Sequence, residues 1–450
     1  MDSHSTFTVL GTGYVGLTTA ALLANSGYTV YAVEPNKTRL DVIKQGKSFF
    51  YEQGLDPVIQ AALAKGTLIP TDSYRESIPK SQIIFSCVGT PDNPDGSSNL
   101  NYVFAAAEEA ASYLAPDSIY VQKSTVPVGT GSRIETLFKE HGKNIQYVSN
   151  PEFLREGTAL HDTLFFDRVV VGSRDKAVAA RVTEVYRTLE AQAEPIATLA
   201  GIDIKTHKGE YITTNLNSAE LIKVTANAFL ALKISFANSI AKLADTVDAD
   251  IVEVMNGVGA DQRIGRAFLQ AGRGYGGGCF PKDVSGLIAS GLEHGIDLDI
   301  MTAAQAINDS MPGYVIEKLR DRLNGDFEEK RIAVLGLAFK AGTSDVRRSP
   351  GIAIANTLKR AGAIVSTYDP QSQKEATVDI INGIDQQETL KAAVHNADAI
   401  IIATEWPELL QHPMADYAAM MHGSIIVDAI NRLDKIEVEA AGLTYIGVGR

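Results

Sequence analysis

The chain has 450 residues, of which 45% are hydrophobic and 21% are charged, and its formal net charge is −13 at pH 7. A chain of this length should hold two or three domains, and its negative charge argues against general binding to nucleic acid or to an anionic membrane surface. We find no signal-peptide pattern and no apolar run of about 18 residues. Two cysteines are too few for a disulfide framework. These features predict a cytoplasmic protein without nucleic-acid or membrane partners.

The first part of the chain carries a dinucleotide-binding pattern. A β-branched strand over 7–10 runs into the glycine motif GTGYVG at 11–16, a helical run follows, and a second strand ends at Glu34. Glycines at this spacing permit a tight turn, close approach of a pyrophosphate and close packing of helix on strand. A carboxylate at position 34 can bond a ribose 2′-hydroxyl and should repel a 2′-phosphate, which favours NAD over NADP. We predict an NAD-binding Rossmann domain over 1–212; a glycine-rich turn of another α/β protein is the alternative.

Three further apolar segments of this domain have the composition of strands, and polar residues follow each of them. Ligands of doubly wound sheets bind at the carboxyl ends of strands, so these polar residues are candidates for the site. Each threonine alone is equally consistent with a helix cap or a turn. Cys87 lies mid-strand in apolar company and is predicted to be a core residue. The strands cover 81–88, 118–123 and 145–148, and the polar candidates are Thr90, Thr125, Glu152 and Glu156.

A long helical pattern begins near Ser218 and continues without glycine or proline through Val247. Lys223 and Asn227 are spaced i, i+4 and share one face, and their apolar neighbours indicate a buried turn rather than a solvated lysine beside a surface asparagine. A long helix that is apolar nearly all round is typical of a dimerisation element. We therefore predict a central helical domain over 213–318 and a homodimer or higher homo-oligomer.

The stretch 272–283 reads GRGYGGGCFPKD and places a cysteine after a run of glycines. Residues without side chains let a ligand lie almost on the backbone, and Pro281 is suited to the first position of a helix. Cys279 would then lie near a helix N-terminus, where the partial positive charge favours thiolate over thiol. The stretch predicts a reactive cysteine; a buried cysteine in a glycine-rich turn is the alternative.

The last part of the chain repeats the strand and helix order of the first. The strand RIAVLGLA is followed by a helix over 351–360, by a strand that ends at Asp369, and by two more apolar strands, ADAIIIAT and GSIIVDAI. We predict a second Rossmann-type domain over 319–450 that lacks GxGxxG and suits a different nucleotide or none. The fold class is therefore α/β, with two Rossmann-type doubly wound domains joined by a central helical domain with one long helix. Basic side chains after the first strand could meet a diphosphate or form a solvated charged loop: Lys340, Arg347 and Arg348.

Taken together, these motifs resemble those of the UDP-glucose/GDP-mannose dehydrogenase family of nucleotide-sugar 6-dehydrogenases, over nearly the whole chain. The motifs, in the order of the family, are GTGYVGL, VGTP with DGS, KSTVPVGT, NPEFLREG, ELIKVTANAFLALKISFAN, DQRIG, GYGGGCFPKD, GLAFKAGTSDVR and ATEW. The resemblance implies a four-electron oxidation of a sugar CH₂OH to a carboxylate with two NAD⁺. The lysine in CFPKD, Lys282, resembles the residue found at this position in the branch of the family that converts UDP-glucose to UDP-glucuronate.

The chemistry of a four-electron oxidation explains why such a family needs a cysteine. The first hydride transfer gives an aldehyde, which has no alkoxide oxygen to expel a second hydride. The resemblance implies that Cys279 adds to this aldehyde, and that hydride loss from the thiohemiacetal gives a thioester.

The resemblance also implies roles for five residues around the cysteine. Lys223 and Asn227 would polarise the carbonyl and hold the oxyanion. Asp283 would serve as a base, and Glu152 and Thr125 would order the lysine and a water near the reacting carbon.

The contacts implied for the two ligands come from several motifs, and no metal ligand is implied. The cofactor contacts are Gly11, Gly13, Tyr14, Val15, Gly16, Glu34, Arg39, Thr90, Thr125, Glu156, Lys282 and Arg347. The substrate contacts are Glu152, Phe153, Leu154, Arg155, Lys223, Asn227, Arg263 (from this subunit or its partner), Tyr275, Gly276 and Lys340.

The sequence departs from the family pattern at three places. Glu34 stands where many members carry Asp, and should still bind NAD. Ile430 stands where the family usually has an arginine, so a basic substrate contact is missing unless Arg432 replaces it. The segment 206–211 resembles an insertion, and we assign it no role. The same chemistry on another nucleotide sugar, such as a UDP-N-acetylhexosamine or GDP-mannose, therefore stays open. The remoter alternatives are an inactive sensor of NAD or UDP-sugar and a two-electron hydroxyacid dehydrogenase.

Overall fold

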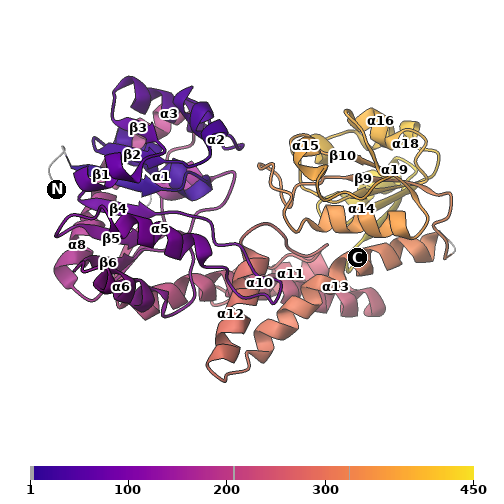
Figure 1. Cartoon of the computed structure of the whole chain (residues 1–450). Coiled ribbons are helices and arrows are strands. Elements are labelled where there is room, and N and C mark those ends of the chain that lie inside the picture. Colours follow the sequence, from indigo (N-terminus) through magenta and orange to yellow (C-terminus); the bar gives the residue numbers. More distant parts are fainter. Residues whose placement is uncertain (1–4, 206–207, 324) are drawn as a thin grey trace. The chain divides into compact units, whose positions relative to one another are not determined.

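The computed structural model describes residues 5–205, 208–323 and 325–450, so that Thr206 and His207 of the apparent insertion lie outside the described residues. The chain divides into two compact units, Met1–Ala226 and Asn227–Arg450. The boundary falls within the long helix α10 (Leu216–Val247), and each unit contains one sheet (Figure 1). The three-domain division at 212 and 318 stays a prediction.

The sheet of the first unit has eight strands in the order β3-β2-β1-β4-β5-β6-β7-β8. The first six are parallel and follow the doubly wound order of a dinucleotide-binding fold, which reverses direction between β1 and β4. Strand β7 runs antiparallel to β6, and β8 parallel to β7. The strands are β1 (Thr6–Leu10), β2 (Thr29–Val33), β3 (Leu68–Thr71), β4 (Ile83–Ser86), β5 (Ile119–Gln122), β6 (Gln146–Ser149), β7 (Arg168–Ser173) and β8 (Glu210–Thr214).

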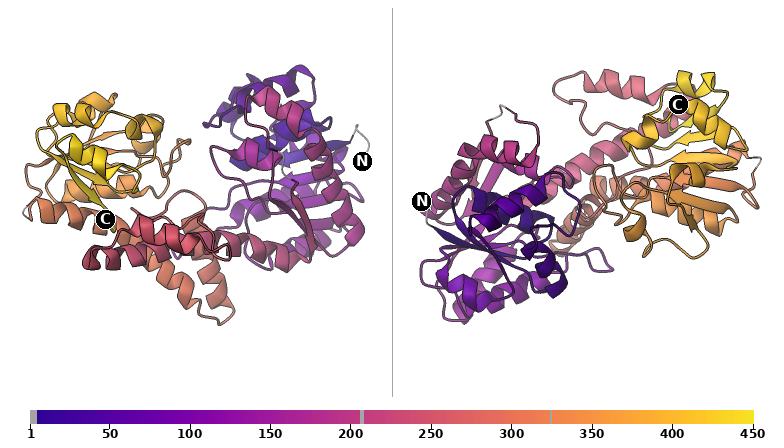
Figure 2. Two further views of the ribbon diagram at one scale, coloured as in Figure 1. Left: turned by 180° about the vertical axis from the view of Figure 1, so that it is seen from behind. Right: turned by 90° about the horizontal axis from the view of Figure 1, so that it is seen from above.

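Helices cover both faces of this sheet because alternate strand residues are apolar on both sides. Ile83 and Phe85 pack into one cluster with α1, α3, α7, α8 and α9, whereas Ile84 packs into another with α5 and α6. In the left view of Figure 2, the magenta α9 lies beside the indigo helices of this unit. The helices are α1 (Tyr14–Asn25), α2 (Lys37–Lys44), α3 (Leu55–Ala64), α4 (Tyr74–Ser77), η1 (Ile78–Lys80), α5 (Asn101–Ala111), α6 (Thr130–Glu140), α7 (Ala159–Leu164), α8 (Lys176–Ala191) and α9 (Ala193–Ala200).

The sheet of the second unit has six parallel strands in the order β11-β10-β9-β12-β13-β14, which repeats the order of the first six strands above. The prediction of two Rossmann-type sheets is thus confirmed. The strands are β9 (Arg331–Leu335), β10 (Ile364–Tyr368), β11 (Asp385–Gln386), β12 (Ala399–Ile402), β13 (Ile425–Asp428) and β14 (Thr444–Gly447).

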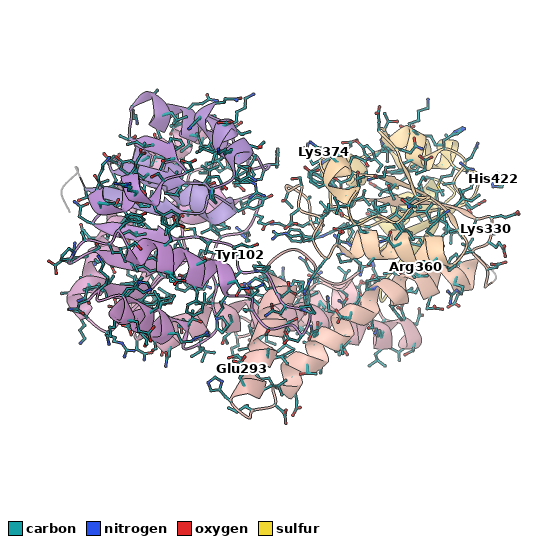
Figure 3. The ribbon with its side chains drawn as sticks, viewed as in Figure 1. Tyr102, Glu293, Lys330, Arg360, Lys374 and His422 are labelled. Atoms are coloured by element: carbon teal, nitrogen blue, oxygen red, sulfur yellow. The ribbon has the colours of Figure 1, made fainter. Side chains whose placement is uncertain are left out.

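One face of the second sheet packs on α14, which lies between the sheet and α13, together with parts of α10 and α11 (Figure 1). The other face packs on α16 to α19. Polar side chains such as those of Arg360, Lys374 and His422 are exposed (Figure 3). The helices are α11 (Ile251–Gly259), α12 (Phe280–Glu293), α13 (Asp299–Arg322), α14 (Pro350–Arg360), α15 (Gln373–Ala376), α16 (Leu390–Val394), α17 (Pro407–Leu410), α18 (Met414–Met420) and α19 (Lys435–Ala440).

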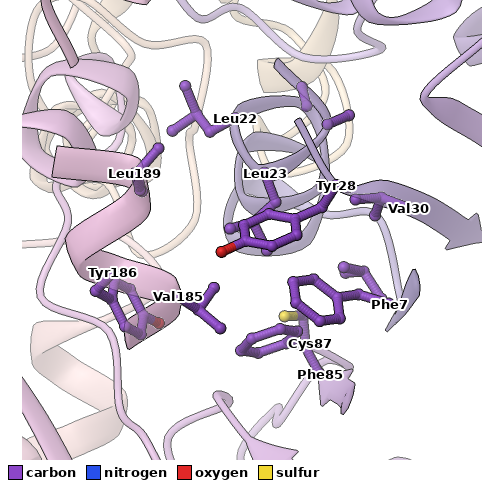
Figure 4. Packing of buried hydrophobic residues seen from close by; sticks show 14 of the residues in the cluster. Phe7, Leu22, Leu23, Tyr28, Val30, Phe85, Cys87, Val185, Tyr186 and Leu189 are labelled. Carbon is purple, nitrogen blue, oxygen red and sulfur yellow. The ribbon is translucent and has the colours of Figure 1, made fainter. Parts of the chain in front are cut away.

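Three aromatic rings form the centre of the first core beneath β1 and β4 (Figure 4). The ring of Phe7 lies 4.5 Å from that of Tyr28 and 6.1 Å from that of Phe85, measured between centroids. Cys87 packs into the same cluster, as predicted. Burial raises the pKa of its thiol to about 12, so Cys87 is an inert core residue.

Each Rossmann-type sheet has one close approach between two glycines. A Cβ on Gly16 would lie 1.9 Å from the carbonyl oxygen of Gly11, and a Cβ on Gly351 would lie 2.3 Å from that of Gly336. Both pairs join the loop after the first strand to the helix that follows. The second pair is fifteen residues apart instead of five, so a search for GxGxxG does not find it.

Helix α10 covers the range that its pattern predicts and is anchored to the first unit by a buried carboxylate. Glu220 Oε2 accepts a hydrogen bond from Gly129 N at 2.7 Å, and Oε1 accepts one from Gly131 N at 2.8 Å, at the start of α6. By length and composition alone α10 could cross a membrane. Its buried polar side chains have protein partners, however, which is typical of a core helix.

The glycine contacts predict a large loss of stability for one substitution and a small effect for a neighbouring one. Gly16→Ala should lower the free energy of unfolding by about 1–3 kcal/mol or more, because the added methyl overlaps the Gly11 carbonyl. Gly13→Ala is the matched control. Its Cβ would meet nothing within 4 Å and its φ of −63° suits alanine, so its effect should stay within about 1 kcal/mol. Urea unfolding followed by circular dichroism measures both, and equal effects would contradict the close packing.

The environment of Glu220 predicts a pH dependence of stability. Burial, aided by the negative charge of Glu135, raises the pKa of this carboxyl from 4.5 to about 7 despite the two N–H donors. The folded chain therefore binds this proton more tightly than the unfolded chain. The stabilisation from Glu220 is complete below about pH 4.5 and is lost as the pH rises through about 7, by on the order of 3 kcal/mol.

Chemical denaturation of wild type and Glu220→Gln across pH 4.5–8 should show this loss in wild type only. A constant difference between the two curves would refute the raised pKa.

Candidate functional site

The loop between β1 and α1 is shaped for a phosphate group. Gly11 has a φ of +82°, Gly13 caps the twelve-residue α1, and the space beside Gly13 is open, since a Cβ there would meet nothing within 4 Å. Amide groups at a helix N-terminus bind anions. At the end of β2, the buried Glu34 accepts hydrogen bonds from Thr12 Oγ1 at 2.5 Å and from Asn36 N at 2.9 Å. These residues fit a dinucleotide with a free ribose 2′-hydroxyl.

Aromatic side chains border this loop. The ring of Tyr14 lies 4.1 Å from that of Phe50, and the guanidinium carbon of Arg39 lies 4.8 Å from the ring centroid of Phe49. Tyr14 and Arg39 thus lie beside the loop, whereas Val15 packs partly into the core.

The loops after β4 and β5 are joined by a side-chain hydrogen bond. Ser124 Oγ donates to the carbonyl of Val88 at 2.6 Å. This bond holds together the two segments that carry the half-buried Thr90 and Thr125. Both threonines follow the carboxyl ends of their strands, as predicted.

A buried ion pair joins the loop after β6 to α10. Lys223 Nζ lies 3.2 Å from Glu152 Oε1, and the side chains are 4% and 8% exposed. Glu152 Oε2 also accepts a hydrogen bond from Leu154 N at 2.8 Å, and Lys223 Nζ lies 5.4 Å from the ring centroid of Phe153. The structure thus brings together four of the predicted residues, and Glu152 fixes the position of the lysine side chain.

The rest of the loop after β6 is held by one residue that the sequence patterns did not reveal, and that residue precedes α3 in the chain. Glu52 is buried, and its carboxylate accepts hydrogen bonds from Gly157 N at 2.8 Å and Leu160 N at 3.3 Å. It therefore fixes the backbone beside the buried Glu156. Arg155 behaves differently, because its side chain is mostly exposed and pairs with Asp162 at 2.7 Å.

In the second unit, Cys279 is the N-cap of α12. The prediction of a helix N-terminus is correct, although Pro281 occupies the second helical position instead of the first. Asp283 is 2% exposed, and both of its oxygens have donors: Asn227 Nδ2 donates to Oδ2 at 2.6 Å and Lys282 Nζ to Oδ1 at 2.6 Å. Because Asn227 Nδ2 donates to Asp283, the nitrogen end of the Asn227 amide faces the carboxylate.

The glycines before Cys279 have a physical reason other than the predicted one. A Cβ on Gly276 would lie 2.3 Å from the carbonyl oxygen of Arg348, one on Gly277 would lie 2.8 Å from the ring of Phe339, and one on Gly278 would lie 2.3 Å from the Arg347 guanidinium. The chain itself therefore fills the space that a side chain at each of these glycines would occupy.

The loop after β9 brings two predicted basic residues into the second unit's site region. Arg347 forms a bidentate ion pair with Asp345 and lies against Gly278, next to Cys279. Lys340 Nζ lies 5.7 Å from the ring centroid of Phe339 in the same loop. The structure thus places these cations around the backbone that leads to the cysteine.

Two predicted substrate residues have different surroundings. Tyr275 is buried and packs edge-to-face with Phe280 at 5.9 Å between centroids. The side chain of Arg263 is 88% exposed and pairs with Asp261, so the structure does not bring it to the residues around Cys279.

The acidic residue at the end of β10 has a different use from Glu34 at the end of β2. Asp369 is buried and accepts hydrogen bonds from five donors of its own unit. The donors are Leu337 N, Ala338 N, Gln371 N, Ser372 N and Trp406 Nε1. The carboxylate thus holds the loop after β9 closed, which explains why the second sheet does not repeat the dinucleotide site.

Ile430, which stands where the family usually has an arginine, lies at the same edge of the second sheet, just after β13. Ile430 packs partly into an apolar cluster, while the preceding Asp428 accepts a hydrogen bond from Leu433 N at 2.7 Å. Burial raises the pKa of the Asp428 carboxyl. Arg432, considered as a replacement for the missing arginine, is exposed.

Comparison with known proteins gives full-length matches. Residues 5–190 match the model of the UDP-glucose/GDP-mannose dehydrogenase family, NAD binding domain, residues 217–310 match its central domain, and residues 333–435 match its UDP binding domain. UDP-glucose 6-dehydrogenase YwqF of Bacillus subtilis (strain 168) is 39% identical over 98% of this chain and 97% of its own length. UDP-glucose 6-dehydrogenase of Rhizobium meliloti (strain 1021) is 38% identical over 98% and 99%.

Solved structures agree in fold. A UDP-glucose dehydrogenase from Pyrobaculum islandicum superposes with a TM-score of 0.88 at 34% identity, covering 99% of this chain and 98% of that one. A UDP-D-ManNAc dehydrogenase from Pyrococcus horikoshii gives a TM-score of 0.86 at 27% identity, with 99% of both chains covered. On the matches of all three domain models and the full-length identities, this chain belongs to the UDP-glucose/GDP-mannose dehydrogenase family and is an NAD-dependent oxidoreductase.

Proposed function

We propose that the protein oxidises UDP-glucose to UDP-glucuronate in two hydride transfers, with Cys279 as the nucleophile between them. The observation that carries the proposal is the arrangement of α10. Lys223 and Asn227 are one helical turn apart, and each has a buried carboxylate partner, Glu152 and Asp283. Asp283 lies in the first turn of the helix that Cys279 caps. A two-electron dehydrogenase has no use for this cysteine.

The residues of the first loop would hold the cofactor. Gly13 and the N-terminus of α1 suit the pyrophosphate, and Glu34 suits the ribose hydroxyls. NAD, when bound, supplies the hydride acceptor. Thr90, Thr125 and Glu156 follow neighbouring strands at the same sheet edge and would border the nicotinamide.

Two side chains on α10, Lys223 and Asn227, would stabilise negative charge on the sugar C6 oxygen. The Lys223 ammonium is oriented by Glu152, so it can attract a developing oxyanion with little reorganisation. Asn227 is oriented by its bond to Asp283 and offers a second donor. Asp283 would accept the proton that leaves the alcohol.

Cys279 would supply what the second oxidation requires. Its sulfur adds to the aldehyde carbon, and the resulting thiohemiacetal carries the oxygen that expels the second hydride. The thioester is then hydrolysed by a water that Glu152 and Thr125 would orient. This sequence keeps the aldehyde bound between the two transfers.

The nucleotide part of the substrate would bind at the carboxyl edge of the second sheet. Lys340 is the first basic residue after the end of β9, and Arg347 lies beside the cysteine segment. Lys282 and the UDP-glucose 6-dehydrogenases among the relatives support UDP-glucose. Ile430 and the likeness to the Pyrococcus horikoshii enzyme favour, as the second candidate, the same reaction on another nucleotide sugar.

The wild-type protein should reduce about two NAD⁺ per UDP-glucose consumed, because the thiohemiacetal permits the second transfer. The NADH yield, measured by absorbance with limiting UDP-glucose, tests this stoichiometry. A UDP-N-acetylhexosamine and GDP-mannose serve as comparison substrates, and faster turnover of either would replace the proposed substrate.

Cys279→Ser should lose turnover by at least about 100-fold while still binding NAD, with Cys87→Ser as the matched thiol control. One NADH per sugar with free aldehyde would refute the cysteine route.

Two coarser expectations accompany this function. The division into domains 1–212, 213–318 and 319–450 is supported by the three matched ranges, one of which falls within each domain. A cytoplasmic location is supported by the small number of cysteines, two in 450 residues, which is too few for a disulfide framework.

We also propose a homodimer formed through α10. Phe229, Phe236, Leu243 and Val247 recur at spacings of seven and four along the helix, and they are 47–60% exposed. Residues at this spacing form one apolar stripe, and a second copy of the same stripe would cover it around a two-fold axis.

Replacing two residues of this stripe should separate the subunits. Phe236→Glu combined with Leu243→Glu places like charges where the two stripes would meet, and light scattering after gel filtration should report a monomer. Ile436→Glu, at an apolar position on α19 that is 76% exposed, is the control and should leave the mass unchanged. A wild-type monomer would rule out the proposed dimer.

A further inference from the structure

One arginine in the cysteine segment has no part in the chemistry above. Arg273 is 4% exposed. Its Nη2 donates to the carbonyl of Phe339 at 2.9 Å and to Thr404 Oγ1 at 3.4 Å, and its backbone N donates to the carbonyl of Ala429 at 2.7 Å. These three acceptors follow β9, β12 and β13, so a single residue links three loops at the carboxyl edge of the second sheet.

Burying this guanidinium is energetically unfavourable. Desolvation lowers its pKa, and attraction to Glu405 and Asp369 only opposes that effect. Within the described part of the chain, Nε and Nη1 have no hydrogen-bond partner. An apolar side chain of similar volume would often be equally or more stable at such a position. Because both nitrogens are shielded from the surface, direct contact with a ligand does not explain the residue either.

The backbone on both sides of Arg273 is held by helices. Gly272 N donates to Asn238 Oδ1 of α10 at 2.7 Å. Tyr275 N donates to Asn308 Oδ1 of α13 at 2.7 Å, and Asn308 Nδ2 donates back to the carbonyl of Tyr275 at 3.2 Å. The side chain of Arg273 therefore connects a segment fixed on the helices with the loops of the sheet.

We infer that Arg273 is a positioning residue that fixes the distance between the cysteine and the nucleotide-binding loop. Its acceptor Phe339 directly precedes Lys340, which would anchor the diphosphate, and Cys279 lies six residues beyond Arg273 in the segment it holds. A nucleotide sugar held at Lys340 must present its C6 atom to one sulfur. This inference rests on the proposed function and adds the residue that keeps the two ends in register.

Arg273→Met tests the inference because it keeps an unbranched side chain and removes the hydrogen bonds. We expect kcat to fall about 10–100-fold, since a misplacement of about 1 Å can cost about 100-fold in rate. The dissociation constant for UDP, measured by calorimetry, should stay within about twofold, because the nucleotide loop itself is intact. Aldehyde trapped by a hydrazine reagent should increase, because the sulfur captures it less efficiently.

Arg360→Met is the matched control, since Arg360 is exposed on α14 of the same unit (Figure 3); all three quantities should equal those of wild type. Arg273→Lys keeps the charge with one donor group and should recover part of kcat, and it decides the question if Arg273→Met does not fold.

An unchanged kcat with only a lower melting temperature would overturn the inference. So would a loss of UDP affinity that accounts for the whole effect, because Arg273 would then bind the nucleotide. Wild-type turnover in the same assay tests the proposed function separately.

Discussion

The ion pair between Lys223 and Glu152 lies almost wholly inside the first unit, where removing either partner would leave an uncompensated charge at a cost of about 3–5 kcal/mol. Glu152 also holds the amide of Leu154, so one carboxylate ties the loop after β6 to α10. Glu220, one turn earlier, ties the same helix to the start of α6. Buried charge, in addition to apolar packing, therefore decides where the lysine of α10 lies relative to the sheet edge at which dinucleotides bind.

The second unit uses buried carboxylates for a related purpose. Asp283 joins Asn227 to Lys282 and thereby orients the amide on α10. Asp369 collects five N–H donors around the loop after β9, and Asp428 closes the turn after β13. Asp369 and Asp428 fix backbone that no regular strand or helix would fix, whereas Asp283 fixes two side chains. Loops that carry ligand contacts can thus be rigid without being hydrophobic.

The two sheets share a strand order and a close glycine contact, yet they suit different ligands. Glu34 accepts two hydrogen bonds at the end of β2 and lies beside a glycine loop with open space at Gly13. At the corresponding place in the second sheet, the carboxylate of Asp369 accepts five hydrogen bonds from neighbouring loops of the second unit. The same topology therefore places an acidic residue beside an open glycine loop in one unit and uses an acidic residue as a structural contact in the other. The first unit matches the family's NAD binding domain and the second contains the match to its UDP binding domain.

Much of the fold could be predicted from the sequence because its signals are local. The glycine motif at 11–16, the alternation of apolar segments and the uninterrupted run from Ser218 to Val247 each depend on residues close together in the chain, and the corresponding sheets and helix are present. The position of Cys279 at the start of a helix could be predicted for the same reason. The antiparallel β7 depends on pairing with a distant strand, and no local pattern indicated it.

The amino-acid sequence by itself determined which residue types are available for chemistry and which segments repeat. Only the tertiary structure decided how they are paired: Glu52 with Gly157, Asp283 with Asn227, and Arg273 with three loops. It also replaced the predicted reason for the glycines at 276–278, since the loop after β9 fills the space that their side chains would occupy. The physical reason is that periodicity and turn chemistry act over a few residues, whereas buried polar partners are chosen by the packing of segments that are distant in the sequence.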